Sequence, residues 1–331
     1  MVKEIKRNDK IRFIFDLAVF SAVLLMVLIC ITLFHYAVIG NSYEQSYNAS
    51  LIDKINRLDC LDGKKIILVG DSSVPFGVNC KLIEEKLGYG VVDLGLYRSL
   101  GNAFAENCCK NRVGSGDIVV IMHSQMFDDN DDIPRADIAW LTVEYHRNLW
   151  EMIRLKDIPD MIRAYPNYIK NTTVLFCSGK QNQVKEDSSY RRDAFNEYGD
   201  ISYRPKSGKW DLERLLSENS NIPTRPGISE KCIDRINGFS DYVEKYGGTV
   251  LVAAPPIFYH NVLPDSKAWM EHKKNLEKRL KCDVISDYTD YFYSDDLFYN
   301  SVTHLTDYGA EIRTKQLIED IQEWMVGKND R

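Results

Sequence analysis

The sequence predicts an α/β protein with a doubly wound parallel sheet of about five strands, preceded by one transmembrane helix. Three observations lead to this class: short continuous apolar runs, helical patterns that alternate with them, and one much longer apolar stretch near the N-terminus. Continuous apolar runs are typical of strands that are buried on both faces. Strands that alternate with helices are typical of a parallel sheet between helical layers.

Five runs are the candidate strands, at residues 65–69, 90–94, 117–122, 248–254 and 282–286. Helical patterns lie at residues 80–87, 100–111, 230–246, 267–280 and 307–325. The stretch from residue 126 to 229 is too long for a simple crossover, and we interpret it as a partly helical insertion. It leaves the sheet after the third strand, so it is placed to roof the carboxyl edge, where open α/β folds bind ligands.

The longest apolar stretch covers residues 17–39 and contains no formally charged side chain. At a rise of about 1.5 Å per residue it is long enough to cross the hydrocarbon core of a bilayer. A cleaved signal peptide is the alternative, but its apolar core is shorter, and His35 and Tyr36 at the end of the stretch resemble an interfacial end. We therefore expect a lipid bilayer to hold this helix as an anchor.

Charges on either side of the apolar stretch predict its orientation. Five basic residues precede it: Lys3, Lys6, Arg7, Lys10 and Arg12. Residues 41–50 carry only Glu44. Because basic flanks stay in the cytoplasm, residues 1–16 are predicted to be cytoplasmic and the rest of the chain periplasmic or extracellular. Residues 40–63 are polar and mixed and are interpreted as a stalk, followed by one domain at residues 64–327.

Composition excludes several function classes. The formal net charge of −6 argues against a nucleic-acid partner, which requires a concentrated basic surface. The eight cysteines form no CxxC pair, so a zinc site is not indicated, and their spacing assigns no disulfide. Residues 128–132 are acidic but lack the glycine and terminal glutamate of a calcium loop, so we expect a solvated acidic turn. The histidines at 123, 146, 260 and 272 lack metal-ligand spacing and are expected on the surface or in loops.

A candidate nucleophile follows the first strand, where Gly70, Asp71, Ser72 and Ser73 lead into a helix. A serine on such a strand-to-helix turn exposes its hydroxyl at the sheet edge and leaves backbone N–H groups free to bind an oxyanion. The alternative is that Ser72 or Ser73 only caps the next helix.

A nucleophilic serine needs a base, and His304 lies just before the last predicted helix. Ser72 and His304 are far apart in the chain, but loops at one edge of a doubly wound sheet can bring such residues together. We therefore expect Ser72 and His304 to meet at the carboxyl edge of the sheet.

These segments resemble the GDSL/SGNH hydrolase superfamily over residues 64–325, particularly its membrane-anchored members associated with envelope polysaccharide and surface-glycan modification. The resemblance implies a three-layer, flavodoxin-like SGNH fold. Gly70, Asp71 and Ser72 resemble the first family block, which implies Ser72 as nucleophile and its N–H as an oxyanion donor. Asp93, Leu94 and Gly95 resemble the second block, which implies the Gly95 N–H as another donor. His304 and Leu305, followed by Gly309, resemble the last block, which implies His304 as general base.

The chain departs from the family pattern at two places. The third block is missing, and His123, Ser124 and Gln125 take its place, with the Gln125 amide as the replacement oxyanion donor. Ser301 stands where the family has an aspartate three residues before the histidine. The orienting group is therefore expected to be Asp295 or Asp296, or else the Asn300 amide. Residues 192–200 also resemble the anchored members, with no role assigned.

The function implied by the resemblance is that of a serine esterase or acyltransferase. It would remove or transfer an O-acyl group, most simply acetyl, on an envelope or extracellular glycan, without a metal or organic cofactor. Water as the second acceptor gives hydrolysis, and a glycan hydroxyl gives transfer. The alternative is a catalytically silent glycan-binding or assembly protein that works with polysaccharide-assembly partners. Asn300 and Ser301, in place of an acid, favour this alternative.

Overall fold

The computed structural model describes residues 7–124, 126, 129–144, 146–185, 188–202, 204, 226–259 and 266–329. Its centre is a five-stranded sheet in which all neighbouring strands are parallel. The strand order is β2 (Gly90–Asp93), β1 (Lys65–Val69), β3 (Ile118–Ile121), β4 (Thr249–Val252) and β6 (Asp283–Val284). The α/β class and the five-stranded parallel sheet are therefore confirmed, and each strand lies within one of the predicted apolar runs.

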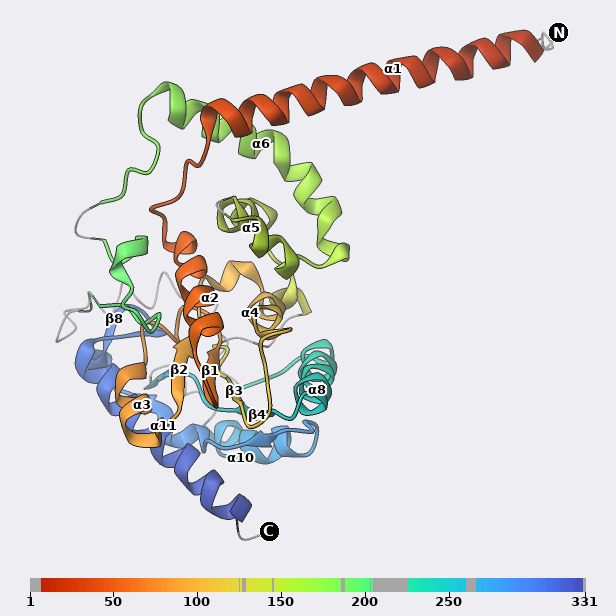
Figure 1. Cartoon of the computed structure of the whole chain (residues 1–331). Helices are drawn as coiled ribbons and strands as arrows, with labels where there is room; N and C mark the ends of the chain where they lie inside the picture. The colour runs from red at the N-terminus through yellow and green to blue at the C-terminus, as the bar shows by residue number, and fades with distance from the viewer. Residues whose placement is uncertain are drawn as a thin grey trace.

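Both faces of the sheet are covered. Ile66 and Leu68 of β1 point to a face packed by α3 (Cys80–Leu87) and α11 (Asp307–Asn329). Ile67 and Val69 point to the opposite face. That face is packed by α4 (Asn102–Cys109), α8 (Glu230–Lys245) and α10 (Ser266–Glu277). Figure 1 shows α3 and α11 on one side of the strands and α8 on the other. This double burial explains why the strands read as continuous apolar runs.

Side-chain caps mark the start of several helices. The Asn79 side chain accepts a hydrogen bond from the Leu82 N–H at the start of α3, and Ser229 accepts one from the Cys232 N–H at the start of α8. At the start of α11, Thr306 Oγ1 accepts a hydrogen bond from the Gly309 N–H at 3.2 Å. These bonds satisfy N–H groups that the first turn of a helix leaves unpaired.

The N-terminal helix α1 covers Arg7–Phe34 and continues into a short π-helical turn, η1, at His35–Ile39. The segment Asp9–Ile39 is long and apolar enough to cross a membrane, and its most apolar part is not buried against the rest of the described structure. The helix begins at Arg7, ten residues before the predicted apolar stretch, so it includes the charged residues that precede that stretch.

Residues 40–63 are not simply a stalk. They contain η2 (Tyr47–Ser50) and α2 (Leu51–Cys60), whose buried residues belong to the same core as Ile67 and Val69 of β1. Leu51, Ile55 and Leu58 recur at helical spacing and are 0–2% exposed. The polar residues between them hid this apolar face at the sequence level. The compact domain therefore begins before residue 64.

In the described part of residues 126–229, α5 (Ala136–Val143) and α6 (Ile158–Cys177) pack on each other. An extended stretch with the short turn η7 (Arg192–Ala194) follows them. The remaining short elements are η3 (Arg98–Leu100), η4 (Asp129–Asp132), η5 (Arg147–Met152), η6 (Leu155–Asp157), β5 (Ile257–Phe258), η9 (Tyr288–Tyr291), β7 (Phe292–Tyr293), η10 (Asp295–Leu297), β8 (Phe298–Ser301) and β9 (His304–Leu305). β5 pairs with β7, and β8 and β9 form a hairpin.

Candidate active site

Ser72 and His304 meet beyond the carboxyl end of β1. The Ser72 Oγ lies 2.8 Å from His304 Nε2, although the two residues are 232 positions apart. Ser72 belongs to the turn that follows β1, and His304 opens β9 in the hairpin before α11. The Leu305 N–H donates to the Phe76 carbonyl at 3.2 Å, so the hairpin is tied directly to the Ser72 turn. The two candidate residues therefore lie within hydrogen-bond reach.

The other ring nitrogen of His304 contacts an amide. His304 Nδ1 lies 2.6 Å from Asn300 Oδ1. Asn300 Nδ2 donates to the Tyr190 hydroxyl at 3.0 Å, and that hydroxyl lies 3.3 Å from His304 Nδ1. Because the Nδ2 group of Asn300 is engaged by Tyr190, its oxygen faces the ring, and Nδ1 carries the ring proton. Nε2 then presents its lone pair to the Ser72 hydroxyl.

Asp296 does not occupy the position next to the imidazole. It lies in η10, where its Oδ1 accepts a hydrogen bond from Ser294 Oγ at 2.5 Å. Of the three residues that sequence reasoning left open for the orienting group, Asn300 contacts His304 Nδ1, and the expectation for Asp296 is wrong. The hairpin explains this outcome, because Asn300 lies on β8 beside β9, whereas Asp296 precedes the hairpin.

The imidazole is held in an apolar setting. The Phe76 ring stacks on the His304 ring with a centroid distance of 4.1 Å and an interplanar angle of 11°. Burial lowers the pKa of His304 to about 4, and the negative charge of Asp71 opposes this shift. His304 is therefore neutral near pH 7, which is the form that accepts a proton from serine.

The turn that carries Ser72 is fixed by its neighbours. Asp71 Oδ1 accepts from the Ser73 N–H at 2.8 Å, and Asp71 Oδ2 accepts from the Ser124 N–H at 2.8 Å. The buried Arg313 of α11 donates to the Ser73 carbonyl at 2.8 Å. The cap of the following helix is Asn79, so the interpretation of Ser72 or Ser73 as that cap is wrong.

One of the three oxyanion donors expected from the sequence, the Gly95 N–H, is already engaged in the structure. It donates to Asp93 Oδ1 at 2.5 Å. A Cβ at position 95 would lie 2.6 Å from Pro75 Cδ, which explains the glycine by close packing. The Ser72 N–H has no hydrogen-bond partner among the described residues, and Gln125 lies outside them. The buried Asn102 lines the same narrow cavity as Gly70 and Asp71, which brings a side-chain amide beside the turn.

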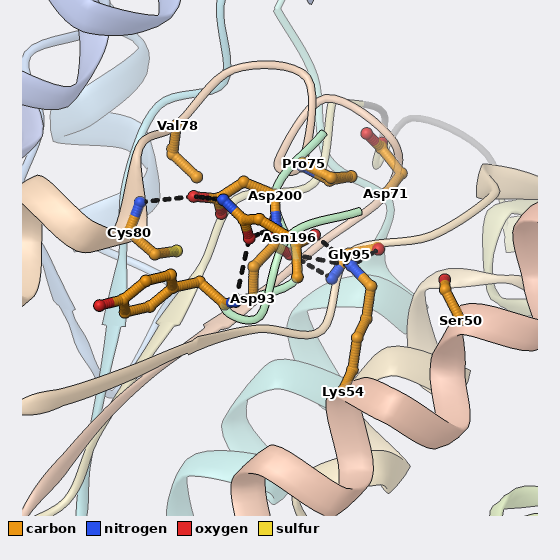
Figure 2. A network of polar contacts seen from close by, with 12 residues as sticks. Ser50, Lys54, Asp71, Pro75, Val78, Cys80, Asp93, Gly95, Asn196 and Asp200 are labelled. Carbon is orange, nitrogen blue, oxygen red and sulfur yellow. Dashed lines mark hydrogen bonds and ion pairs between the residues drawn. The ribbon is translucent and has the colours of Figure 1, made fainter. Parts of the chain in front are cut away.

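A second polar cluster lies beside the Ser72 turn and is drawn in Figure 2. The buried Lys54 of α2 donates to the Gly95 and Gly199 carbonyls at 2.7 and 2.8 Å and lies 3.8 Å from Asp93. Asp200 Oδ2 accepts from the Cys80 N–H at 2.7 Å. Burial raises the pKa of both carboxyls and lowers that of Lys54, while the ion pairing opposes these shifts.

This cluster gives residues 192–200 a structural role. The Asp93 N–H donates to the Tyr198 carbonyl at 2.9 Å, which fastens the segment to the end of β2. Gly199 has a φ of +98°, and a Cβ there would lie 2.4 Å from the Asp93 carbonyl oxygen. Only glycine fits this approach. The segment therefore places Asp200 in the polar cluster, and Tyr190, which contacts His304, lies two residues before its start.

Two further expectations need correction. His272 lies in α10 and is 6% exposed, so it is neither on the surface nor in a loop. His123 lies in the loop after β3, as expected, but it is buried at 2% exposure, and His260 lies outside the described residues. The expected acidic turn is only partly solvated, because Asp132 is buried and lies 2.9 Å from Arg235. In the part of the chain that the structure describes, no group of three or more His, Cys, Asp or Glu side chains is arranged to hold a metal ion. All eight cysteines are free thiols.

Three residues of the site had no signal in the sequence: Tyr190, Lys54 and Arg313. Each acts on a partner more than 40 positions away, so no local pattern marks it. Comparison of the chain with protein-family models, with curated proteins and with solved structures finds no match.

Proposed function

We propose that this protein is a serine esterase or O-acyltransferase of the GDSL/SGNH type. Its substrate is an O-acyl group, most simply acetyl, on an envelope or extracellular glycan. The observation that carries the proposal is the contact of Ser72 Oγ with His304 Nε2 at 2.8 Å, with Asn300 on the opposite ring nitrogen. A serine, an imidazole base and a group that orients the imidazole are the parts that acyl transfer needs.

In the proposed reaction, Ser72 Oγ attacks the ester carbonyl and His304 Nε2 takes the hydroxyl proton. The negative oxygen of the tetrahedral intermediate faces the Ser72 N–H. The bond from the carbonyl carbon to the sugar oxygen then breaks, and His304 returns the proton to that oxygen. Water or a glycan hydroxyl repeats the steps on the acyl-enzyme and releases the acid or the new ester.

A carbohydrate substrate is supported by the aromatic residues around the imidazole. The rings of Tyr97 and Tyr190 stack with a centroid distance of 6.0 Å, and Tyr97 is 36% exposed. Tyr299 packs on Phe76 beside the His304 ring. Aromatic side chains combine an apolar face with a polar edge, which suits a sugar ring that carries both C–H faces and hydroxyls.

The arrangement of strands and the N-terminal helix support the finer points of the proposal. The strand order and the helices on both faces agree with a doubly wound, flavodoxin-like sheet. The apolar helix α1 would anchor the chain in a bilayer, with the basic N-terminal flank in the cytoplasm and the domain outside. Such a placement would bring the site to envelope or extracellular glycans.

The proposal is tested by ester turnover with the purified full-length protein. Wild type should hydrolyse a generic acetyl ester and release acetate from O-acetylated glycans, and Ser72→Ala should lower turnover by roughly 10³-fold or more. Ser73→Ala is the matched control, because the Ser73 Oγ is buried without a hydrogen-bond partner in the described structure. Equal turnover by wild type and Ser72→Ala would refute the proposal.

A catalytically silent glycan-binding or assembly protein is the second candidate. It is favoured by the amide at Asn300 in place of a carboxylate, because an amide does not stabilise the imidazolium that forms during attack. The lowered pKa of His304 also favours this second candidate, because an imidazole of low pKa is a weak base toward the serine hydroxyl. Glycan binding without Ser72-dependent turnover would establish this second function.

A further inference from the structure

Helix α6 contacts the N-terminal helical segment at two points inside the candidate membrane span, one in α1 and one in η1. The Tyr165 hydroxyl of α6 donates to Thr32 Oγ1 at 3.0 Å. The His35 ring lies 2.7 Å from Thr172 Oγ1, also of α6. Figure 1 shows α6 beside the C-terminal end of α1. Since Thr32 and His35 both lie within Asp9–Ile39, α6 lies close to the depth at which that helix leaves the bilayer.

The two contacts also give the direction in which α6 approaches the membrane. Thr32 is three residues deeper in the span than His35, and its partner Tyr165 is seven residues closer to the start of α6 than Thr172. The beginning of α6 therefore lies on the membrane side of its end. Residues 158–162 lie one to two helical turns before Tyr165, toward the same end of α6.

The face of α6 that carries Tyr165 is apolar and open. Ile158, Ile162, Tyr165 and Ile169 recur every three or four residues and so share one side of the helix. Ile162 is 65% exposed, and Leu155, just before the helix, is 86% exposed. The polar residues Asp160, Asn167 and Lys170 occupy the other exposed side. This pattern is typical of a helix that lies between water and lipid.

Aromatic side chains gather at the same junction. Trp140 packs on Trp150, Tyr165 and Tyr168, with ring centroids 4.8 to 5.1 Å apart. These four residues line a cavity together with Thr32 and Tyr36 of the N-terminal helical segment. Tryptophan and tyrosine concentrate at the level of lipid headgroups, where one end of the side chain meets water and the other meets acyl chains.

We propose that the N-terminal half of α6, together with Leu155, lies in the outer interface of the bilayer as a second membrane contact. The partner is the lipid surface. This inference rests on the proposed anchoring by α1. A single anchoring helix lets the domain change its orientation relative to the bilayer, whereas a second contact through α6 fixes that orientation. The Ser72 site then keeps a constant height above the membrane and serves glycans that are attached to, or emerge at, that surface.

Spin labels on the full-length chain in lipid vesicles test this inference. The exposed cysteines, Cys30, Cys60 and Cys177, are replaced by serine. One label is then placed at position 162 by Ile162→Cys, and a matched control at position 167 by Asn167→Cys, on the polar side of the same helix. Collision with oxygen, which enters the bilayer, is compared with collision with a water-soluble nickel chelate. The ratio of oxygen to nickel collisions should be several-fold higher at 162 than at 167.

Equal ratios at the two positions, whether both aqueous or both in lipid, would overturn the inference. A third preparation that keeps only Cys30 among the exposed cysteines reports on the anchor itself. If Cys30 is immersed while position 162 is aqueous, the second contact fails and the anchor stands. If Cys30 is aqueous, the anchoring fails and the inference fails with it. Ester turnover by the same preparations reads the proposed activity separately.

Discussion

Two buried polar clusters flank the Ser72 turn, and they are built from different chemistry. In the first, the His304 imidazole contacts Ser72, Asn300 and Tyr190, all of them neutral groups. In the second, the Lys54 ammonium lies between backbone carbonyls and the Asp93 carboxyl, with Asp200 close enough to act on both. In the described first cluster, the group on His304 Nδ1 is an amide and not the carboxylate of a triad. In the second cluster, the Asp93 and Asp200 carboxyls accept hydrogen bonds from backbone N–H groups.

The charged cluster and the neutral cluster are expected to have different roles. Charges in the second cluster hold chain segments together, because Lys54 of α2 donates to the Gly95 and Gly199 carbonyls and Asp200 accepts from the Cys80 N–H. In the first cluster, burial keeps the imidazole neutral and the amide fixes its tautomer. Stability is therefore expected to depend on the charged cluster, and the proposed reactivity on the neutral one.

The largest effect is expected for Lys54→Met. The substitution leaves the buried Asp93 without its cation, and removing one partner of a buried ion pair costs about 3–5 kcal/mol. Denaturant unfolding of the full-length protein measures the free energy. Lys315→Met is the control, since its pair with Glu311 is exposed and the free energy of unfolding should barely change. Equal effects of the two substitutions would show that the cluster does not stabilise the fold.

Replacing the amide by an acid tests the neutral cluster. Asn300→Asp places a carboxylate on His304 Nδ1, stabilises the imidazolium and should raise ester turnover by about 10-fold or more. Asn300→Ala removes the orienting group and should lower turnover below wild type. The measurement is kcat for wild type, Asn300→Asp and Asn300→Ala on the same acetyl ester. An aspartate that leaves kcat unchanged would mean that imidazolium formation does not limit the reaction.

The pH dependence follows from the same cluster. His304 must be unprotonated to accept the Ser72 proton, and its pKa is lowered to about 4 by burial. Turnover should therefore stay level from neutral pH downward and fall only as the pH drops through that pKa. In Asn300→Asp the falling limb should move to higher pH, because the carboxylate favours the protonated ring. A limb near the ordinary histidine pKa in wild type would contradict the burial argument.

The smallest effect is expected for Tyr190→Phe. The change removes the acceptor of the Asn300 Nδ2 hydrogen bond, a neutral bond worth about 1 kcal/mol, so kcat should fall by roughly 5-fold. The fall should be in kcat, with KM much less affected, because the bond orients the base. Tyr259→Phe removes a hydroxyl from an exposed tyrosine and is the control. A fall in kcat as large as that of Asn300→Ala would contradict this role, because it would mean that Tyr190 does more than hold Asn300 in place.

The sheet could be predicted because its strands are buried on both faces, which leaves continuous apolar runs such as residues 65–69 and 118–121. The helix α2 could not be, because its buried face is interrupted by Lys54, a residue type that is normally exposed. Its burial depends on the Gly95 and Gly199 carbonyls and on Asp93, which only the fold brings together.

The candidate site shows the same division. Ser72 and His304 could be named from local motifs, each placed beside a strand or helix that the sequence marks. The sequence does not distinguish Asp295, Asp296 and Asn300 as the orienting group, because the short β8–β9 hairpin that places Asn300 beside His304 has no clear periodic pattern. The Gly95 N–H was expected to be free, and the side chain of Asp93, two residues before it, takes it instead.

The most direct test of the central claim is covalent labelling of the purified full-length protein by a fluorophosphonate, which reacts with serines that a neighbouring base activates. The account predicts that wild type and Ser73→Ala are labelled on Ser72, that Ser72→Ala is not labelled, and that His304→Ala is labelled far more slowly. A wild-type protein that resists the probe under conditions that label a known serine esterase, or a Ser72→Ala variant labelled as fast as wild type, would contradict it.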